Sequence, residues 1–221
     1  MSYSFDYRKY ICMMSKYNLH TKEVFLPAKS STEDFFKKNK EHIFLIKSGI
    51  IKSFLKTNTE QLHSILGKGF FVGYYTIFEE EQTLLEFETL TDCELYLFHK
   101  KDVELSVSLL PEGLYFQNSI MKMTAKNWYY KSLLSFASKQ DRLKLAFEIL
   151  SELHGEKLNH DWTVLPKAIN SKTVRTYCCV SKGFFYKQLQ KLMTQGIIVR
   201  KDKQWIVNVN IIQGLDFRPK N

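Results

Sequence analysis

The chain has 221 residues, of which 44% are hydrophobic and 14% aromatic, so it has enough apolar material for packed cores and wholesale disorder is excluded. Only four Pro and nine Gly exclude a collagen-like or linker-rich architecture. The net charge of +9 is unevenly distributed: residues 1–110 carry 14 Lys and Arg against 15 Asp and Glu, whereas residues 111–221 carry 18 against 8. A neutral front half joined to a basic rear half indicates that a polyanion binds the rear half.

Membrane and metal chemistry have little support in the sequence. No apolar run reaches the roughly 18 residues of a membrane span, and residues 1–14 lack the apolar core of a signal peptide. We therefore expect a cytoplasmic protein without a membrane partner. The cysteines, Cys12, Cys93, Cys178 and Cys179, have no metal-ligand spacing and form no CxxC motif, which predicts free, buried thiols, no metal and no cofactor.

Short β-rich segments separated by turn signals fill the front half from about residue 24 to residue 98. The predicted elements are two strands in 42–56 around Ser48-Gly49, a polar turn at 57–61, a strand at 62–66, a glycine-punctuated bend at 67–73, and two strands in 85–100. Strands this short and this regularly spaced predict a small β-barrel or jelly roll.

A long helix is predicted from Pro111 to about residue 137, with apolar residues on two faces. One face is a heptad seam, which we assign to a homodimer contact: Phe116, Ile120, Met123, Asn127, Tyr130 and Leu134. Within this seam, Asn127 resembles a residue that sets the register. The other face carries Leu114, Met121 and Trp128 and is expected to cover the barrel. A helix that packs only within its own chain stays an open alternative.

The rear half continues with a sequence of helices and strands that is typical of a winged helix-turn-helix. The predicted elements are helices at 139–153 and 171–178, a strand at 162–166, an amphipathic helix beginning at Ser181, and a hairpin at 196–209. In a winged helix-turn-helix the second helix enters the major groove and its N-terminal residues contact base edges.

The candidate DNA-binding residues lie on the amphipathic helix and on the tip of the hairpin. They are Ser181, Lys182, Gly183, Lys187, Gln190, Lys191, Lys201 and Lys203. Ser181 is expected to cap the helix and bind a phosphate, and Lys182 and Lys187 to reach guanine or phosphate. Gly183 would allow close backbone approach, Gln190 can pair with adenine, and Lys191 and the two hairpin lysines would bind phosphates.

Two stretches, FVGYYTIFEEEQTLLEFETLTDCELYLF (71–98) and KTVRTYCCVSKGFFYKQLQKLMTQGIIVRKDKQWIVNV (172–209), are similar without gaps to the Crp-Fnr family of bacterial transcription regulators. The resemblance covers about residues 20–212. It implies an α+β fold with a sensor barrel at 1–110, a dimerisation helix at 111–137 and a winged helix-turn-helix domain at 138–221. It also implies double-stranded DNA with a roughly palindromic operator, a second copy of the chain, and RNA polymerase as partners.

The resemblance also places individual residues. Ser181 and Lys182 stand at the family's Ser-Arg helix start, Gly183 at its base-reading Glu, and Lys187 at its second base-reading Arg. Cys179 stands where the family usually has the Gly of the turn.

In the phosphate-binding cassette the resemblance implies a degenerate site. Gly73 is retained, but Tyr74 replaces the ribose-binding acid, and Leu84 and Leu85 replace the Arg and hydroxyl residue that hold the cyclic phosphate. Burying a phosphate beside two leucines without a cation is unfavourable, so we predict that the chain does not bind cAMP or cGMP. The effector is therefore unknown: an apolar or peptide-like molecule, a partner protein, or none. The branch of virulence-type activators resembling PrfA is the nearest comparison within the family.

An enzyme is not indicated, because the sequence has no phosphate-binding Gly loop, no HExxH and no GxSxG motif. The densest carboxylate run, at 78–82, is interpreted as a solvated hairpin turn. The second hypothesis for function is a protein-interaction module that does not bind DNA and has a basic C-terminal half.

Overall fold

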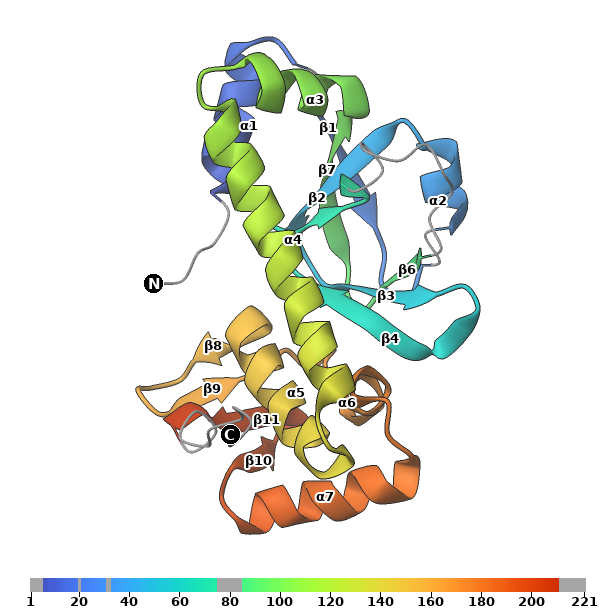
Figure 1. The fold of residues 1–221 in the computed structure, drawn as a ribbon, viewed down its shortest axis with the longest axis vertical. Coiled ribbons are helices and arrows are strands. Elements are labelled where there is room, and N and C mark those ends of the chain that lie inside the picture. The colour runs from blue at the N-terminus through green and yellow to red at the C-terminus, as the bar shows by residue number, and fades with distance from the viewer. Residues whose placement is uncertain (1–5, 20, 31–32, 75–84, 211–221) are drawn as a thin grey trace. The chain divides into compact units, whose positions relative to one another are not determined.

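The structure of the protein is a computed structural model, which describes residues 6–19, 21–30, 33–74 and 85–210 (Figure 1). The chain divides into two compact units, one made of residues 1–59 and 63–129 and the other of residues 60–62 and 130–221. The division falls inside the long helix α4 (Gly113–Phe136), which contributes residues to both units. No helix in the described ranges combines the length and apolarity needed to cross a bilayer.

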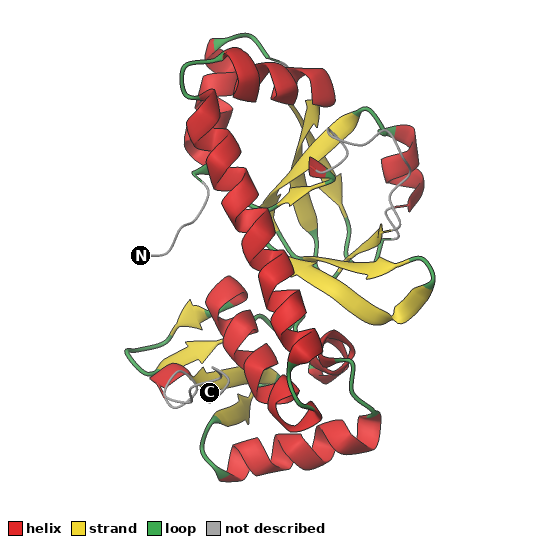
Figure 2. Cartoon of the chain, viewed as in Figure 1, coloured by secondary structure: helices red, strands yellow, loops and turns green. Residues whose placement is uncertain are grey.

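The first unit is built around two sheets whose strands run in the orders β1-β7-β2-β5 and β4-β3-β6, a jelly-roll-like arrangement (Figure 2). Its elements are α1 (Tyr7–Lys16), β1 (Thr21–Leu26), α2 (Glu33–Lys38), β2 (His42–Ser48), β3 (Ile51–Leu55), β4 (Asn58–Leu66), β5 (Phe71–Val72), β6 (Leu85–Thr89), β7 (Cys93–His99), α3 (Lys100–Leu109) and α4. The predicted strands at 42–56 and 85–100 are confirmed. The predicted polar turn at 57–61 is wrong in part, because β4 already begins at Asn58.

Strand β2 separates two apolar clusters because successive side chains of a strand point to opposite faces. Ile43 and Leu45 lie in one cluster, with residues of α1, α3 and α4. Phe44 and Ile46 lie in the other, with residues of β1, β3 and β6. A strand buried on both faces is a continuous apolar run, and the sequence HIFLI has that pattern.

Helix α1 completes the first cluster, although the sequence analysis did not predict it. Asp6 caps the helix, since its side chain accepts a hydrogen bond from the Lys9 backbone N–H. The ring of Tyr10 is fully buried and meets the rings of Phe98 and Phe116 edge-on, with centroid distances of 5.5 and 5.2 Å. Its hydroxyl is hydrogen-bonded with Ser106 of α3 at 3.0 Å, so the one polar atom of this ring is satisfied.

The second unit contains three helices and a four-stranded sheet with the strand order β10-β11-β9-β8. Its elements are α5 (Lys139–His154), β8 (Glu156–Lys157), β9 (Trp162–Val164), α6 (Ser171–Cys178), α7 (Lys182–Thr194), β10 (Ile198–Lys201) and β11 (Gln204–Asn208). The predicted helices, the strand near 162 and the hairpin are confirmed as elements. At the centre of the unit, Phe147 of α5 meets Trp205 of β11 edge-on, with ring centroids 5.5 Å apart.

The turn between α6 and α7 contains Cys179 in the left-handed region, with φ 55° and ψ 47°. A side chain with a Cβ atom is strained there, and glycine is not. The position therefore has the backbone geometry of a turn glycine although its residue is cysteine. All four cysteines are free, as predicted, but Cys12 is exposed and Cys179 is half-buried, so the prediction that every thiol is buried is wrong.

Substitutions at Cys179 are expected to rank by their tolerance of a positive φ. Cys179→Gly removes the Cβ strain, offset in part by the greater freedom of glycine in the unfolded chain, and should leave the free energy of unfolding unchanged or raise it by up to about 1 kcal/mol. Cys179→Val introduces a β-branched side chain and should lower it by about 1–2 kcal/mol. Urea unfolding of the two variants measures the difference. Equal stability of the glycine and valine variants would show that the turn does not hold this conformation.

Candidate nucleic-acid interface and sensor cavity

Helix α7 has one buried apolar face and one exposed basic face. Phe185, Leu189 and Leu192 are at most 7% exposed, which confirms them as core residues. The candidate DNA-binding residues of the helix are all exposed: Lys182, Gly183, Lys187, Gln190 and Lys191. At about 100° per residue, Gly183, Lys187, Gln190 and Lys191 lie on the side of the helix opposite the core, whereas Lys182, the first residue of the helix, lies beside the core face.

Ser181 stands at the N-cap of α7, as predicted, but its side chain makes no capping hydrogen bond. The expectation that its hydroxyl caps the helix is therefore wrong, and this exposed hydroxyl makes no bond to its own helix. At Gly183, a Cβ atom would meet nothing within 4 Å, so the glycine leaves open space at the first turn.

The hairpin of β10 and β11 ends in an exposed basic tip. Lys201 and Gln204 form the last paired positions, and Asp202 and Lys203 between them have positive φ values of 50° and 66°. Two consecutive positive φ values are typical of the two-residue turn that matches strand twist. Arg200, which was not among the predicted DNA-binding residues, is exposed, and its guanidinium lies 4.8 Å from the Trp205 ring centroid. Its place beside two tip lysines was the signal that could have identified it.

The two faces of α4 are the reverse of the prediction. Of the predicted dimerisation residues, four are buried within the chain, namely Phe116 (3% exposed), Ile120 (0%), Asn127 (7%) and Leu134 (2%), while Met123 and Tyr130 are half-buried. Phe116 and Ile120 belong to the core around Tyr10, and the Tyr130 hydroxyl donates to the Glu152 carboxylate. The four buried side chains of this row therefore pack inside their own chain.

The row that was expected to cover the barrel is the exposed one. Leu114, Met121 and Trp128, spaced by seven residues, are 66%, 52% and 56% exposed. Tyr115 and Tyr129 beside them are 57% and 59% exposed. An exposed apolar row this long on one helix marks an interaction surface.

The first unit contains a small cavity of about 50 Å³ between its sheets and α4. It is lined in part by Gly73, Tyr74 and Leu85 of the predicted cassette; Leu84 lies outside the described residues, as does the carboxylate run at 78–82. The cavity has room for one or two water molecules at about 30 Å³ each, whereas pockets for drug-sized ligands measure about 300–1,000 Å³.

The described lining of this cavity carries no carboxylate, ammonium or guanidinium group. Tyr74, at the position of the ribose-binding acid, is only 5% exposed, packs its ring 5.8 Å from that of Phe71, and has a phenol pKa raised by burial. Gly73 has φ 81°, the left-handed conformation that explains why a glycine is retained there.

Asn127 contributes an unusual polar atom to this cavity. Its side-chain oxygen is buried and has no hydrogen-bond partner among the described residues. Ser53 and Ser64, which also line the cavity, are hydrogen-bonded to each other. An unsatisfied buried acceptor costs about 1–3 kcal/mol, so a donor from a small molecule or a water would stabilise this site.

The family model of the cyclic nucleotide-binding domain matches residues 33–105. A search of curated protein sequences found no match.

Several solved structures share the fold. A cyclic nucleotide-binding domain-containing protein from Listeria monocytogenes is 15% identical, with a TM-score of 0.79 over 93% of this chain and 98% of the other. The c-di-GMP-responsive global regulator CLP from Xanthomonas campestris is 18% identical, with a TM-score of 0.66 over 90% and 99%. A CRP/FNR-family transcriptional regulator from Thermus thermophilus is 14% identical, with a TM-score of 0.64 over 87% and 97%. Residues 33–105 thus match a cyclic nucleotide-binding domain, and the chain shares the fold of CRP/FNR-family transcription regulators.

Proposed function

We propose that the chain is a sequence-specific DNA-binding transcription regulator that acts as a homodimer on a roughly palindromic operator and is not controlled by cAMP. The observation that carries the proposal is the exposed basic face of α7, beside a three-residue turn and a basic hairpin tip. In this proposal residues 1–110 are a sensor barrel, residues 111–137 a dimerisation helix and residues 138–221 a winged helix-turn-helix domain. RNA polymerase is the further partner of such a regulator, and membership of the PrfA-like branch stays a prediction.

The contacts of α7 would divide into base reading and phosphate binding. Lys182 and Lys187 on its first two turns would reach base edges in the major groove, as the N-terminal residues of recognition helices do. The Ser181 hydroxyl and Lys191 would bind phosphates, and Gln190 would pair with adenine. Lys201 and Lys203 at the hairpin tip, joined by Arg200, would add salt-dependent affinity without sequence information.

A homodimer would present two such helices to the two halves of an operator. The exposed row of Leu114, Met121 and Trp128, rather than the buried seam, is the surface on which a second copy would pack. A repeat of seven residues on both helices suits parallel packing about a two-fold axis, because each side chain then meets its own equivalent or a near neighbour. A two-fold protein reads a two-fold DNA sequence, which is why a palindromic site is expected.

Selection of bound sequences from a random double-stranded DNA pool tests the proposal. The proposed function predicts enrichment of one motif with two inverted half-sites. A pool that stays unenriched while the protein binds every sequence equally would refute sequence-specific recognition. A protein that binds no DNA at all would instead favour the protein-interaction module.

Cyclic nucleotides are expected to leave the protein unchanged. Titration with cAMP or cGMP up to about 1 mM should give no binding heat in calorimetry, because the cavity holds about 50 Å³ and its described lining offers no charge to the phosphate. A dissociation constant in the micromolar range for either nucleotide would contradict this prediction. An unrelated cyclic nucleotide-binding protein under the same buffer conditions is the positive control.

A further inference from the structure

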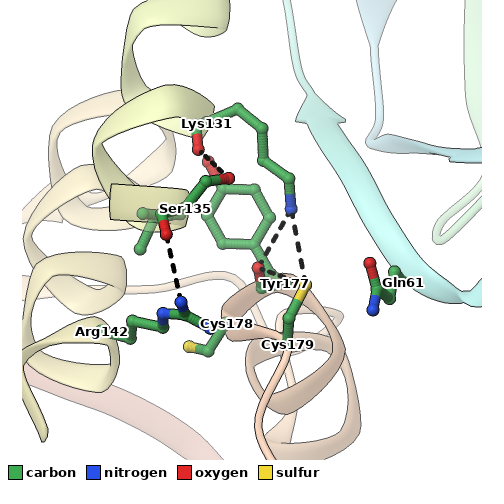
Figure 3. Close-up of a pocket in the computed structure, with 8 residues that line it drawn as sticks. Gln61, Lys131, Ser135, Arg142, Tyr177, Cys178 and Cys179 are labelled. Atoms are coloured by element: carbon green, nitrogen blue, oxygen red, sulfur yellow. Dashed lines mark hydrogen bonds between the residues drawn. The ribbon is translucent and has the colours of Figure 1, made fainter. Parts of the chain in front are cut away.

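A second cavity, of about 240 Å³, lies entirely among residues of the second compact unit (Figure 3). Its lining includes two cations, Lys131 of α4 and Arg142 of α5, and, among the described residues, no Asp or Glu. The polar groups of Gln61 and Ser135 and the thiol of Cys179 also line it. A polar cavity lined by two positive charges attracts an anion.

Lys131 is half-buried. Its ammonium donates hydrogen bonds to the backbone carbonyls of Leu62 and Tyr177 and lies 3.9 Å from the Cys179 sulfur and 5.2 Å from the Tyr177 ring centroid. Among the described residues it has no carboxylate partner. Burial lowers the pKa of Lys131, against the opposing effect of the neighbouring thiols, because a desolvated ammonium without a counter-ion is unfavourable.

Arg142 has N–H groups that are not used in its hydrogen bonds to the described residues. Its Nε donates to the Ala137 carbonyl and its Nη2 to the Ser135 carbonyl, both at 3.1 Å. A guanidinium has five N–H groups, and the other three have no hydrogen-bond partner among the described residues. Free N–H groups of arginine favour carboxylate and phosphate oxygens, which they bind in pairs.

We infer that this cavity is a binding site for a small oxyanion, a metabolite with a carboxylate or phosphate group held by Arg142 and Lys131. The volume corresponds to about eight water molecules and is below the roughly 300–1,000 Å³ of pockets for drug-sized ligands, so the ligand is small. The exposed Gln61 amide supplies a further N–H donor at the rim, whereas the Ser135 hydroxyl already donates to the Lys131 carbonyl at 3.0 Å.

The site adjoins the turn that precedes the candidate recognition helix, which gives it a regulatory role if the proposed function holds. Lys131 contacts the Tyr177 carbonyl and the Cys179 sulfur, and Cys179 is the C-cap of α6, two residues before the N-cap of α7. An oxyanion that binds Lys131 competes with these two contacts of the turn. If the anion binds one conformation of this turn more tightly than another, it shifts the population of the two conformations and so changes the affinity for DNA.

Alkylation of two thiols in one molecule tests the site without DNA. The full chain is treated with iodoacetamide, a neutral alkylating reagent, in three parallel reactions that contain sodium chloride, inorganic phosphate or malonate. All three have the same ionic strength. Peptide mass spectrometry follows the modification of each cysteine over time. Cys179 lines the cavity, and Cys12, which is exposed on α1, is the internal control. At about 10 mM, phosphate or malonate should slow alkylation of Cys179 at least about threefold, a millimolar affinity, and leave Cys12 unchanged. The anion that protects Cys179 shows whether the site prefers a phosphate or a carboxylate group.

Thermal unfolding of matched variants provides a second measurement. At about ten times its dissociation constant, the protecting anion should raise the melting temperature of the wild type and of Lys139→Gln by about 3–5 °C, and that of Lys131→Gln not at all. Lys139 is an exposed lysine of α5 outside the cavity. Equal melting shifts in all three proteins, or an unchanged Cys179 rate with both anions, would overturn the inference. Neither assay contains DNA, so this failure and a failure of DNA recognition are separate results.

Discussion

Lys187→Ala is expected to lower affinity for the selected operator by about 5- to 150-fold per half-site, which corresponds to about 1–3 kcal/mol for one base contact. The residue is exposed on α7, on the side opposite Phe185 and Leu189, so its ammonium is free to enter the groove. Affinity for a scrambled sequence should fall much less. Fluorescence anisotropy with both duplexes at fixed salt measures the two losses.

Lys203→Ala is the matched control, because it removes the same charge from the hairpin tip. A phosphate contact contributes equally to all sequences, so this variant should weaken operator and scrambled DNA alike and reduce the salt dependence by about one counter-ion per protomer. Both lysines are exposed, and the melting temperature of each variant should match the wild type. If the two variants weaken both duplexes to the same extent, Lys187 is not a base-reading residue.

Met121→Glu is expected to convert the homodimer into monomers at micromolar concentration. Met121 lies between Leu114 and Trp128 in the exposed apolar row, and a two-fold interface would bring the two new carboxylates close together. Loss of an apolar contact together with like-charge repulsion costs several kcal/mol, so the dissociation constant should rise at least about 30-fold. Analytical ultracentrifugation over a concentration series measures it, and operator affinity should fall with it.

Gln140→Glu adds the same charge at an exposed polar position of α5, outside this row. This control should leave the association unchanged. A Met121→Glu protein that remains as dimeric as the wild type would show that the second copy does not pack on this row. Ile120→Glu is unsuitable as a probe of the interface, since Ile120 is fully buried and the change would damage the core.

Local patterns in the sequence predicted most of the elements correctly. The apolar run HIFLI, the Pro and Gly around residue 111 and the spacing of Phe185, Leu189 and Leu192 each specify their element through burial and backbone preference. Helix α1 was missed although its Tyr7, Tyr10, Ile11 and Met14 have helical spacing.

Local sequence pattern did not predict which face of α4 is buried. Both of its rows are apolar, and no property of the helix by itself decides which one is covered. Tyr10 of α1 and Val103 of α3, distant in sequence, pack on Phe116 and Ile120 and decide it. The Lys131 cavity depends in the same way on tertiary structure, since Gln61, Lys131, Arg142 and Cys179 come from four separate elements.

Footprinting on the selected operator reports sequence recognition, symmetry and stoichiometry in one experiment. The proposed function predicts two protected half-sites in inverted orientation, with centres one helical turn or a multiple of it apart, about 10–10.5 bp per turn, and two protomers per duplex. A single protected half-site with one protomer, or protection that does not depend on sequence, would contradict it.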